Sequence, residues 1–294
     1  MTTLILQLKL QWENQRRFWN LFQQNYLGMV GLLMLTICVF VALFCPWLSP
    51  FDPTEPTMEF LEGPSSLHFF GTDQMGRDLF SRILYGTKIS MMVGITAALI
   101  AVLIGTSIGL ISGYFGGKIG EGLMRFTDMF LVLPYLPLMI ILTAILGQNQ
   151  IILITVIGVT SWPSMARIIR SEVLSIKQRA FVERARAIGA SHFHIILKHI
   201  LPNVMPLISA NVVLIIPVAI ISESTLSFIG LGDPTTVSWG SILNDSLNNN
   251  AIMMEQWWFY LPPGLAIVFL SLGFSLIGHA LDEIANPKLR KEHS

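Results

Sequence analysis

The chain has 294 residues, of which 53% are hydrophobic and only 12% are charged, and its formal net charge is zero. Soluble chains carry about 25% charged residues, so this composition excludes a surface that faces water on all sides. The balanced charge gives no reason to expect nucleic acid as a partner. We therefore expect a membrane protein, with the lipid bilayer around most of its surface.

The N-terminal part of the chain predicts a membrane anchor. Residues 1–26 mix apolar and basic side chains, which is typical of a helix in the cytoplasmic interface of the membrane; a partly ordered tail is the alternative. Residues 27–48 are uncharged and long enough to cross the hydrocarbon layer. No small-residue cleavage site closes this run, so we expect an uncleaved first span, followed by an outer segment at 49–88.

Residues 89–281 predict five further spans. The second lies over Ile89–Phe115, and the third and fourth share the uncharged stretch Met129–Ala166, which the polar residues 147–150 divide. The fifth covers Val204–Ser222 and the sixth Gln256–Leu281. Because backbone groups in lipid must bond to one another, the predicted fold class is all-α, a polytopic transmembrane bundle of about six helices.

Basic residues indicate the orientation. With both termini inside, cytoplasmic parts hold 15 of the 18 Lys and Arg residues, including those of the tail 282–294, whereas Arg77, Arg82 and Lys88 fall outside. This bias predicts N-in, C-in topology. We expect Arg82 and Lys88 at the outer headgroups, and Arg125 and Asp128, three residues apart, as an ion pair on one helix.

The inner loop 171–203 predicts two short helices joined by a bend. Gly189 can end the first helix with a positive φ, Ser191 can cap a second over His192–Ile200, and Pro202 limits its extension. Two readings stay open: the loop binds a soluble partner, or it rests on lipid headgroups. In the first case an apolar stripe would fill a groove on the partner, and its residues are Phe181, Val182, Ala185 and Ile188.

This loop resembles the EAA motif of ABC-importer permeases. Matching positions are Glu183, Ala185, Gly189, Leu201 and Pro202, while Arg184 departs from the second alanine and His199 from a hydrophobic position. The resemblance implies a type I importer permease fold that couples to separate ATPase subunits around Gly189. The coupling residues would be Glu183, Arg184, Ala185, Gly189, Leu201 and Pro202.

Two outer stretches resemble the dipeptide, oligopeptide and nickel branch of that family, and within it the shorter, C-type subunit. The first supplies residues suited to turns and to capping a helix from Leu79 to Tyr85, with substrate contact or partner docking as alternatives; they are Gly71, Thr72, Asp73, Gly76, Arg77 and Asp78. The second, 226–232, is followed by Ser238-Trp239-Gly240 and predicts a helix end or a gate.

Glu223 is the main ionisable residue expected at membrane depth. Such residues are functional candidates by default, although neighbouring serines allow a structural hydrogen-bonding role. The candidate gate or path residues are therefore Glu223, Ser227, Gly230 and Gly232. His192, His194 and His199 have no carboxylate or cysteine at ligand spacing, so no metal site is predicted.

The resemblance also implies the partners and the function. They are a paralogous permease forming a heterodimer, two ATP-binding subunits and an extracytoplasmic binding protein, in a bacterial cytoplasmic membrane. The expected function is ATP-driven import of di- or oligopeptides, with nickel or another metal chelate as the alternative and an ion-coupled transporter less favoured. Gly116-Gly117-Lys118 is followed by Ile119 and makes no phosphate-binding loop, so we expect no enzyme activity and no bound cofactor, with ATP and Mg on the partner subunits.

Overall fold

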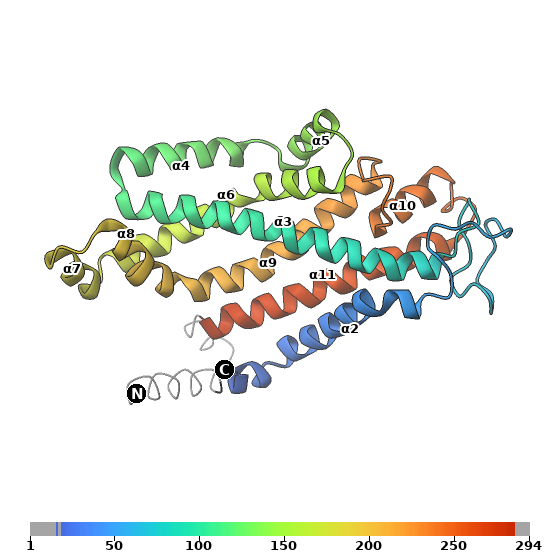
Figure 1. Ribbon diagram of the computed structural model, residues 1–294, viewed down its shortest axis with the longest axis horizontal. Coiled ribbons are helices and arrows are strands. Elements are labelled where there is room, and N and C mark those ends of the chain that lie inside the picture. Colours follow the sequence, from blue (N-terminus) through green and yellow to red (C-terminus); the bar gives the residue numbers. More distant parts are fainter. Residues whose placement is uncertain (1–15, 17–18, 286–294) are drawn as a thin grey trace.

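The structure is a computed structural model that describes residue 16 and residues 19–285. Its regular elements are helices, and the described part adds only an isolated antiparallel bridge between Thr72 and Asp78. Long helices lie side by side along the longest axis, with the loops of 49–78 at one end and α7 and α8 at the other (Figure 1). The helices are α2 (Tyr26–Leu48), α3 (Leu79–Phe115), α4 (Gly117–Val132), α5 (Tyr135–Leu146), α6 (Gln150–Lys177), α7 (Ala180–Ala187), α8 (His192–Ile195), the π-helix η1 (Ile196–Ile200), α9 (Leu201–Phe228), α10 (Trp239–Asn248) and α11 (Trp257–Ala285).

The bundle has the expected number of spans. Five helices are long and apolar enough to cross a membrane, and α4 with α5 makes a sixth that is bent by 88°. An even number of spans returns the end of α11 to the side where α2 begins (Figure 1). The prediction of an all-α bundle with about six spans is confirmed. Most of the predicted interfacial segment 1–26 and of the tail 282–294 lies outside the described residues.

The third span differs from its prediction. It begins at Gly117 rather than near Met129, and it breaks at Leu133-Pro134, both of which have extended backbone. Proline has no N–H to donate and disfavours helical backbone in the residue before it, so the helix ends there. The polar hairpin before α6 lies where the sequence placed it, and Asn149 caps α6.

Pro202 does not end the second inner helix. Helical structure runs without interruption from His192 to Phe228. The π-helix Ile196–Ile200 ends two residues before Pro202, so the missing N–H falls where the regular hydrogen-bond ladder is already interrupted. The Asn203 side chain adds a hydrogen bond to the carbonyl of His199 at 2.7 Å.

Glycines line the most extensive helix contact, between α3 and α6. Gly105, Gly109 and Gly113 recur every four residues on α3. A Cβ at Gly109 would lie 2.7 Å from the Cβ of Ile169 and 2.8 Å from the carbonyl oxygen of Ala166 on α6. Small residues let helices approach closely in lipid, where van der Waals packing rather than the hydrophobic effect holds them together. This contact makes α3 and α6 the centre of the bundle.

Candidate functional site

Asp73 organises the outer end of the molecule. Its Oδ1 accepts hydrogen bonds from the backbone N–H groups of Met75 at 2.8 Å and Arg77 at 2.9 Å. Its Oδ2 accepts from the Arg77 Nε at 2.7 Å and from the Arg82 Nη1. Asp73 is fully buried, so these donors replace the hydrogen bonds that water would otherwise make to it.

Both arginines also bind Asp245 on α10. The Arg82 Nη2 lies 2.9 Å and the Arg77 Nη2 lies 3.2 Å from its Oδ2. We call Asp73, Arg77, Arg82 and Asp245 the outer charge cluster. Arg82 is only 2% exposed, so its predicted place at the outer headgroups is wrong: two carboxylates compensate its charge inside the protein. The cluster ties the start of α3 to α10.

The remaining residues of the first outer motif form turns and caps. Gly71 has φ +69°, and a Cβ there would lie 2.2 Å from the carbonyl oxygen of Glu62, so no larger residue fits. A Cβ at Gly76 would lie 2.5 Å from a carbonyl oxygen as well. Thr72 exchanges hydrogen bonds with the backbone of Glu62. Asp78 caps α3 by accepting from the N–H of Ser81 at 2.7 Å.

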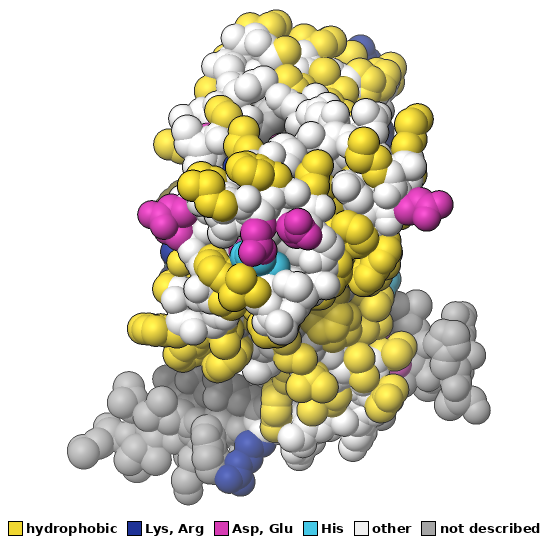
Figure 2. Space-filling view, turned by 90° about the vertical axis from the view of Figure 1, so that its right-hand side faces the viewer, with side chains coloured by type: hydrophobic (Ala, Val, Ile, Leu, Met, Phe, Trp, Pro, Cys, Tyr) yellow, Lys and Arg dark blue, Asp and Glu magenta, His cyan; other side chains and the backbone are white. Residues whose placement is uncertain are grey.

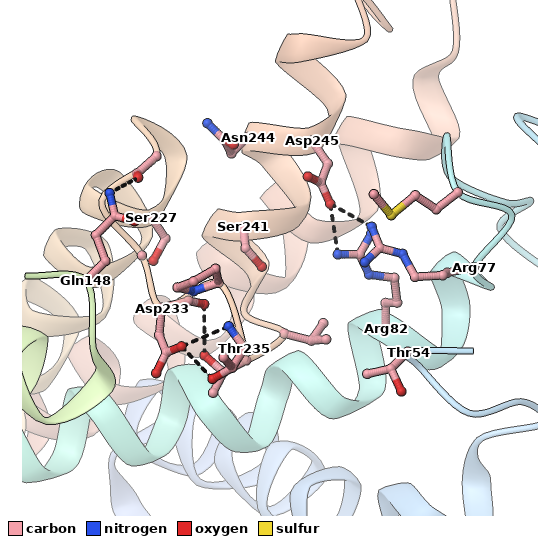
Figure 3. A pocket seen from close by; sticks show the side chains of 16 residues that line it. Thr54, Arg77, Arg82, Gln148, Ser227, Asp233, Thr235, Ser241, Asn244 and Asp245 are labelled. Carbon is pink, nitrogen blue, oxygen red and sulfur yellow. Dashed lines mark hydrogen bonds and ion pairs between the residues drawn. The ribbon is translucent and has the colours of Figure 1, made fainter. Parts of the chain in front are cut away.

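A polar pocket of about 320 Å³ opens beside the charge cluster. Arg77 and Arg82 lie at one side, the turn after α9 and the α5–α6 hairpin at the other, and α10 between them (Figure 3). We call it the outer pocket. It joins candidates from both outer stretches, since Arg77 comes from the first and Ser227, Gly230 and Gly232 from the second. Further lining side chains that can donate or accept hydrogen bonds are Thr54, Gln148, Asp233, Thr235, Thr236, Ser241 and Asn244.

Hydrogen bonds hold the far wall of the outer pocket together. The Gln148 Nε2 donates to the carbonyl oxygen of Gly230 at 2.9 Å, and the Asn244 Nδ2 donates to that of Phe228 at 2.6 Å. These contacts join the α5–α6 hairpin and α10 to the end of α9. A movement of α9 would therefore change the shape of the pocket.

Asp233 lies on this wall with its own set of donors. Its Oδ1 accepts from the N–H and Oγ1 of Thr235, at 2.8 and 2.6 Å, and its Oδ2 accepts from the N–H of Gln150 at 3.1 Å. Partial burial opposes ionisation, but these hydrogen bonds outweigh it and hold the pKa of the Asp233 carboxyl below its usual value. The group is therefore an anion at neutral pH.

Glu223 lies beneath the pocket in a cage of serines. Its Oε1 accepts from the Ser227 Oγ at 2.8 Å, and its Oε2 is 3.3 Å from the Ser224 Oγ and 3.4 Å from the Ser90 Oγ of α3. The side chain is 2% exposed. Glu223 therefore joins α9 to α3 inside the protein. Gly232 packs against Ser227, whose Oγ would lie 2.7 Å from an added Cβ.

At the opposite end, Gly189 makes the bend between α7 and α8. Its φ is +83°, and no heavy atom lies within 4 Å of an added Cβ. Ser191 caps the next helix by accepting from the N–H of His194. We call residues 188–191 the inner bend. Glu183 and Arg184 are exposed beside it, where another protein can reach them.

The apolar stripe of α7 serves this chain's own core, contrary to the groove-filling prediction. Val182 and Ala185 are buried and pack in one cluster with Ile176 of α6 and Ile195 of α8, and Phe181 is partly buried against it. Only Ile188 projects, with 85% of its surface exposed. In the first turn of α9, Leu201 is half-buried and Pro202 exposed. α7 is thus fixed to the bundle by its apolar face.

Two further contacts near the inner end involve polar side chains. The Tyr114 hydroxyl lies 2.8 Å from the Nδ1 of His192, which joins α3 to α8. Asp128 pairs with Arg167 of α6 at 2.6 Å rather than with Arg125, so the predicted pair within one helix is wrong. The chain reverses at Gly116, between α3 and α4, and α4 then packs against α6, which brings Arg167 to Asp128. Among the described residues no group of three His, Cys, Asp or Glu side chains is arranged to hold a metal ion.

Comparison with known proteins identifies the family. Residues 105–291 match the model of the family described as the binding-protein-dependent transport system inner membrane component. That match covers more than half of the chain. This chain belongs to that family. Residues 15–64 of this transport-system component also match the N-terminal transmembrane domain of oligopeptide transport permease C.

Curated relatives of this transport-system component are permeases. It is 39% identical to the dipeptide transport system permease protein DppC of Bacillus subtilis, over 93% of this chain and 85% of DppC. It is 36% identical to the oligopeptide transport system permease protein OppC of the same organism, over 92% and 88% of the two chains. The glutathione transport system permease protein GsiD of Escherichia coli is 36% identical, over 93% and 90%.

A solved structure supports the fold of this transport-system component. It is similar to a chain of the inward-facing MetNI methionine ABC transporter, with a TM-score of 0.55 and 18% sequence identity over 69% of this chain and 94% of that one. The expected ABC-importer permease fold is confirmed.

Several lining residues of the outer pocket could not be predicted from the sequence. Asp233 precedes proline and threonine, a pattern that predicts a turn, but nothing in it indicates a pocket. Asp245 meets arginines that lie more than 160 residues earlier. Only the fold brings these groups together, so spacing along the chain gave no signal for them.

Proposed function

We propose that this chain is the permease subunit of an ATP-driven importer for di- or oligopeptides in a bacterial cytoplasmic membrane. The observation that carries the cargo assignment is the identity of 39% with a dipeptide permease over 93% of this chain. The outer pocket agrees with it, since peptides present ammonium, amide and carboxylate groups that polar linings can bind. The chain would form half of the path beside a paralogous permease.

The energy would come from partner subunits. The sequence contains no phosphate-binding loop, so two ATP-binding subunits would bind and hydrolyse ATP with Mg, and an extracytoplasmic binding protein would deliver the cargo. The inner bend would receive the movement of one ATP-binding subunit. The bend exposes Ile188, it has open space around Gly189, and Glu183 and Arg184 of α7 are exposed beside it, which suits contact with a protein that approaches closely.

The gate would lie at the outer end of α9. Ser227, Gly230 and Gly232 line or border the outer pocket, and Glu223 holds the same helix end to α3. Opening would require these contacts to rearrange as α9 moves.

Reconstitution tests the proposal directly. The full set of subunits in liposomes, supplied with binding protein and ATP, should accumulate labelled tri-alanine, and omission of this chain or of ATP should abolish uptake. Uptake of nickel but not of peptide would refute the cargo assignment. Peptide uptake by this chain alone would refute the division of labour among subunits.

A further inference from the structure

The outer end of the molecule is strongly acidic although the whole chain is neutral. Residues 49–88 and 229–256 contain nine carboxylates against three basic side chains. Figure 2 shows acidic side chains standing out on this end face. A cation that approaches from outside is therefore attracted, and an anion is repelled.

The outer pocket has one carboxylate more than it has cations to compensate. Arg77 and Arg82 each bind Asp73 and Asp245, so the outer charge cluster is balanced within itself. Asp233 receives only neutral donors, from Thr235 and Gln150, and among the described residues it makes no ion pair. The pocket thus carries an uncompensated negative charge beside hydroxyl and amide groups.

We propose that Asp233 is the counter-charge for the ammonium terminus of a peptide held briefly in the outer pocket. This inference rests on the proposed function. The Oδ2 of Asp233 accepts one hydrogen bond, at 3.1 Å, and has lone-pair capacity for a further, charged donor. Around it the hydroxyls of Thr236 and Ser241 and the amides of Gln148 and Asn244 can bond to peptide groups.

The charge balance also favours this polarity. A peptide carboxylate would meet guanidinium groups whose charges Asp73 and Asp245 already compensate, through the Nη groups of Arg82 and the Nε and Nη2 of Arg77. A peptide ammonium group would meet an uncompensated carboxylate at Asp233, so the N-terminus is the group that this pocket favours. Figure 3 shows Asp233 apart from the arginines, on the side of the pocket formed by the turn after α9.

A purely structural role for Asp233 gives a different expectation. Asp233→Asn keeps an oxygen that accepts from Thr235, so the turn persists, while the charge and the hydrogen bond from the Gln150 N–H are lost. Asp233→Glu keeps the charge. Glu62→Gln is the matched control, since Glu62 is an exposed carboxylate of the same outer end that does not line the pocket.

Saturation-transfer NMR on the assembled importer in nanodiscs measures peptide binding to the importer itself, because the binding protein is left out. The probes are tri-alanine and N-acetyl-tri-alanine. We expect tri-alanine to bind the wild type and Glu62→Gln equally. Acetylation or Asp233→Asn should weaken affinity about ten-fold, as for one charge-assisted hydrogen bond, and Asp233→Glu should restore part of it.

Either of two results would overturn the site. One is equal affinity of the wild type and Asp233→Asn for tri-alanine, and the other is absence of tri-alanine binding to the wild type. Uptake of tri-alanine by the wild-type importer, measured separately with binding protein, distinguishes a wrong role for Asp233 from a wrong proposed function. If tri-alanine is taken up but does not bind at Asp233, the role of Asp233 is refuted and the proposed function stands.

Discussion

Arg82 on α3 donates to the Oδ2 of Asp245 on α10 at 2.9 Å across 163 residues of chain, and through Asp73 it also anchors the outer turn. Removing one partner of such a buried group leaves an uncompensated charge. We expect Arg82→Gln to lower the stability of the assembled importer by about 3 kcal/mol, measured by thermal unfolding in detergent.

The matched control for this change is Arg167→Gln. Arg167 and Asp128 also form an ion pair, but both side chains are about half exposed. Water screens such pairs, so the loss should stay below about 1 kcal/mol. Equal losses for the two variants would show that the outer charge cluster adds no stability of its own.

Gly109 should tolerate no side chain. Gly109→Ala places a methyl group 2.8 Å from the backbone oxygen of Ala166, which a side-chain rotation cannot relieve. The expected destabilisation is about 1–3 kcal/mol in the same unfolding measurement. Gly122→Ala meets open space on α4 and should be neutral or slightly stabilising, because alanine favours helix. A neutral Gly109→Ala would contradict the close packing of α3 on α6.

Glu223 is expected to act through its hydrogen bonds. Glu223→Gln keeps an acceptor for Ser227 and a similar size, whereas Glu223→Leu leaves the surrounding hydroxyls without that partner. The leucine variant should lose about 2 kcal/mol and the glutamine variant less than half of that. If both variants were as stable as the wild type but neither transported, the carboxylate would serve transport rather than structure.

Topology can be checked with an impermeant thiol reagent on spheroplasts. Ser65→Cys and Met253→Cys place thiols on exposed outer residues and should be labelled, while Ser175→Cys should not. Native Cys38 and Cys45 are buried, so the wild type gives the background. Labelling of Ser175→Cys alone would invert the orientation.

Gly189 tests the coupling proposal. Gly189→Val forces a β-branched residue to φ +83°, at a cost of about 1–3 kcal/mol, and adds bulk where a partner would approach. We expect assembly to persist and ATP hydrolysis to lose its stimulation by cargo-loaded binding protein. The readout is the ratio of stimulated to basal hydrolysis, with assembly checked by co-purification.

Gly117→Val supplies the control for strain. Gly117 also has positive φ and open space around it, but it lies in the α3–α4 connection. The Gly117→Val importer should keep the stimulation of ATP hydrolysis by cargo-loaded binding protein. If the Gly189→Val importer also kept it, the inner bend would have no coupling role, and the alternative that α7 rests on lipid headgroups would remain.

Much of the fold follows from the sequence, because long apolar runs and basic residues report directly on burial in lipid. The helix break at Pro134 was not predicted, because the same uncharged stretch contains both this break and the hairpin at Gly147. The spacing of Gly105, Gly109 and Gly113 was visible and indicates close helix packing, but it does not identify α6 as the partner. The same holds for the candidate site. Local caps such as Asp78 could be predicted from neighbouring residues. The Asp128–Arg167 pair and the outer charge cluster could not, because they form only when helices that are distant in sequence meet.

The unbroken helix from His192 to Phe228 has a mechanical consequence. Its 37 residues measure about 55 Å from end to end, so a single rod starts beside the inner bend and finishes beside the outer pocket. Tilting the part beyond Ile200 by about 10° would sweep its outer tip through about 7 Å, while a point near Pro217 would move roughly half as far. Small angular displacements on the cytoplasmic side would thus be magnified with distance. The opening of the pocket would then depend on the length and stiffness of one helix, with Pro206 and Pro217 as the places where that stiffness is lowest.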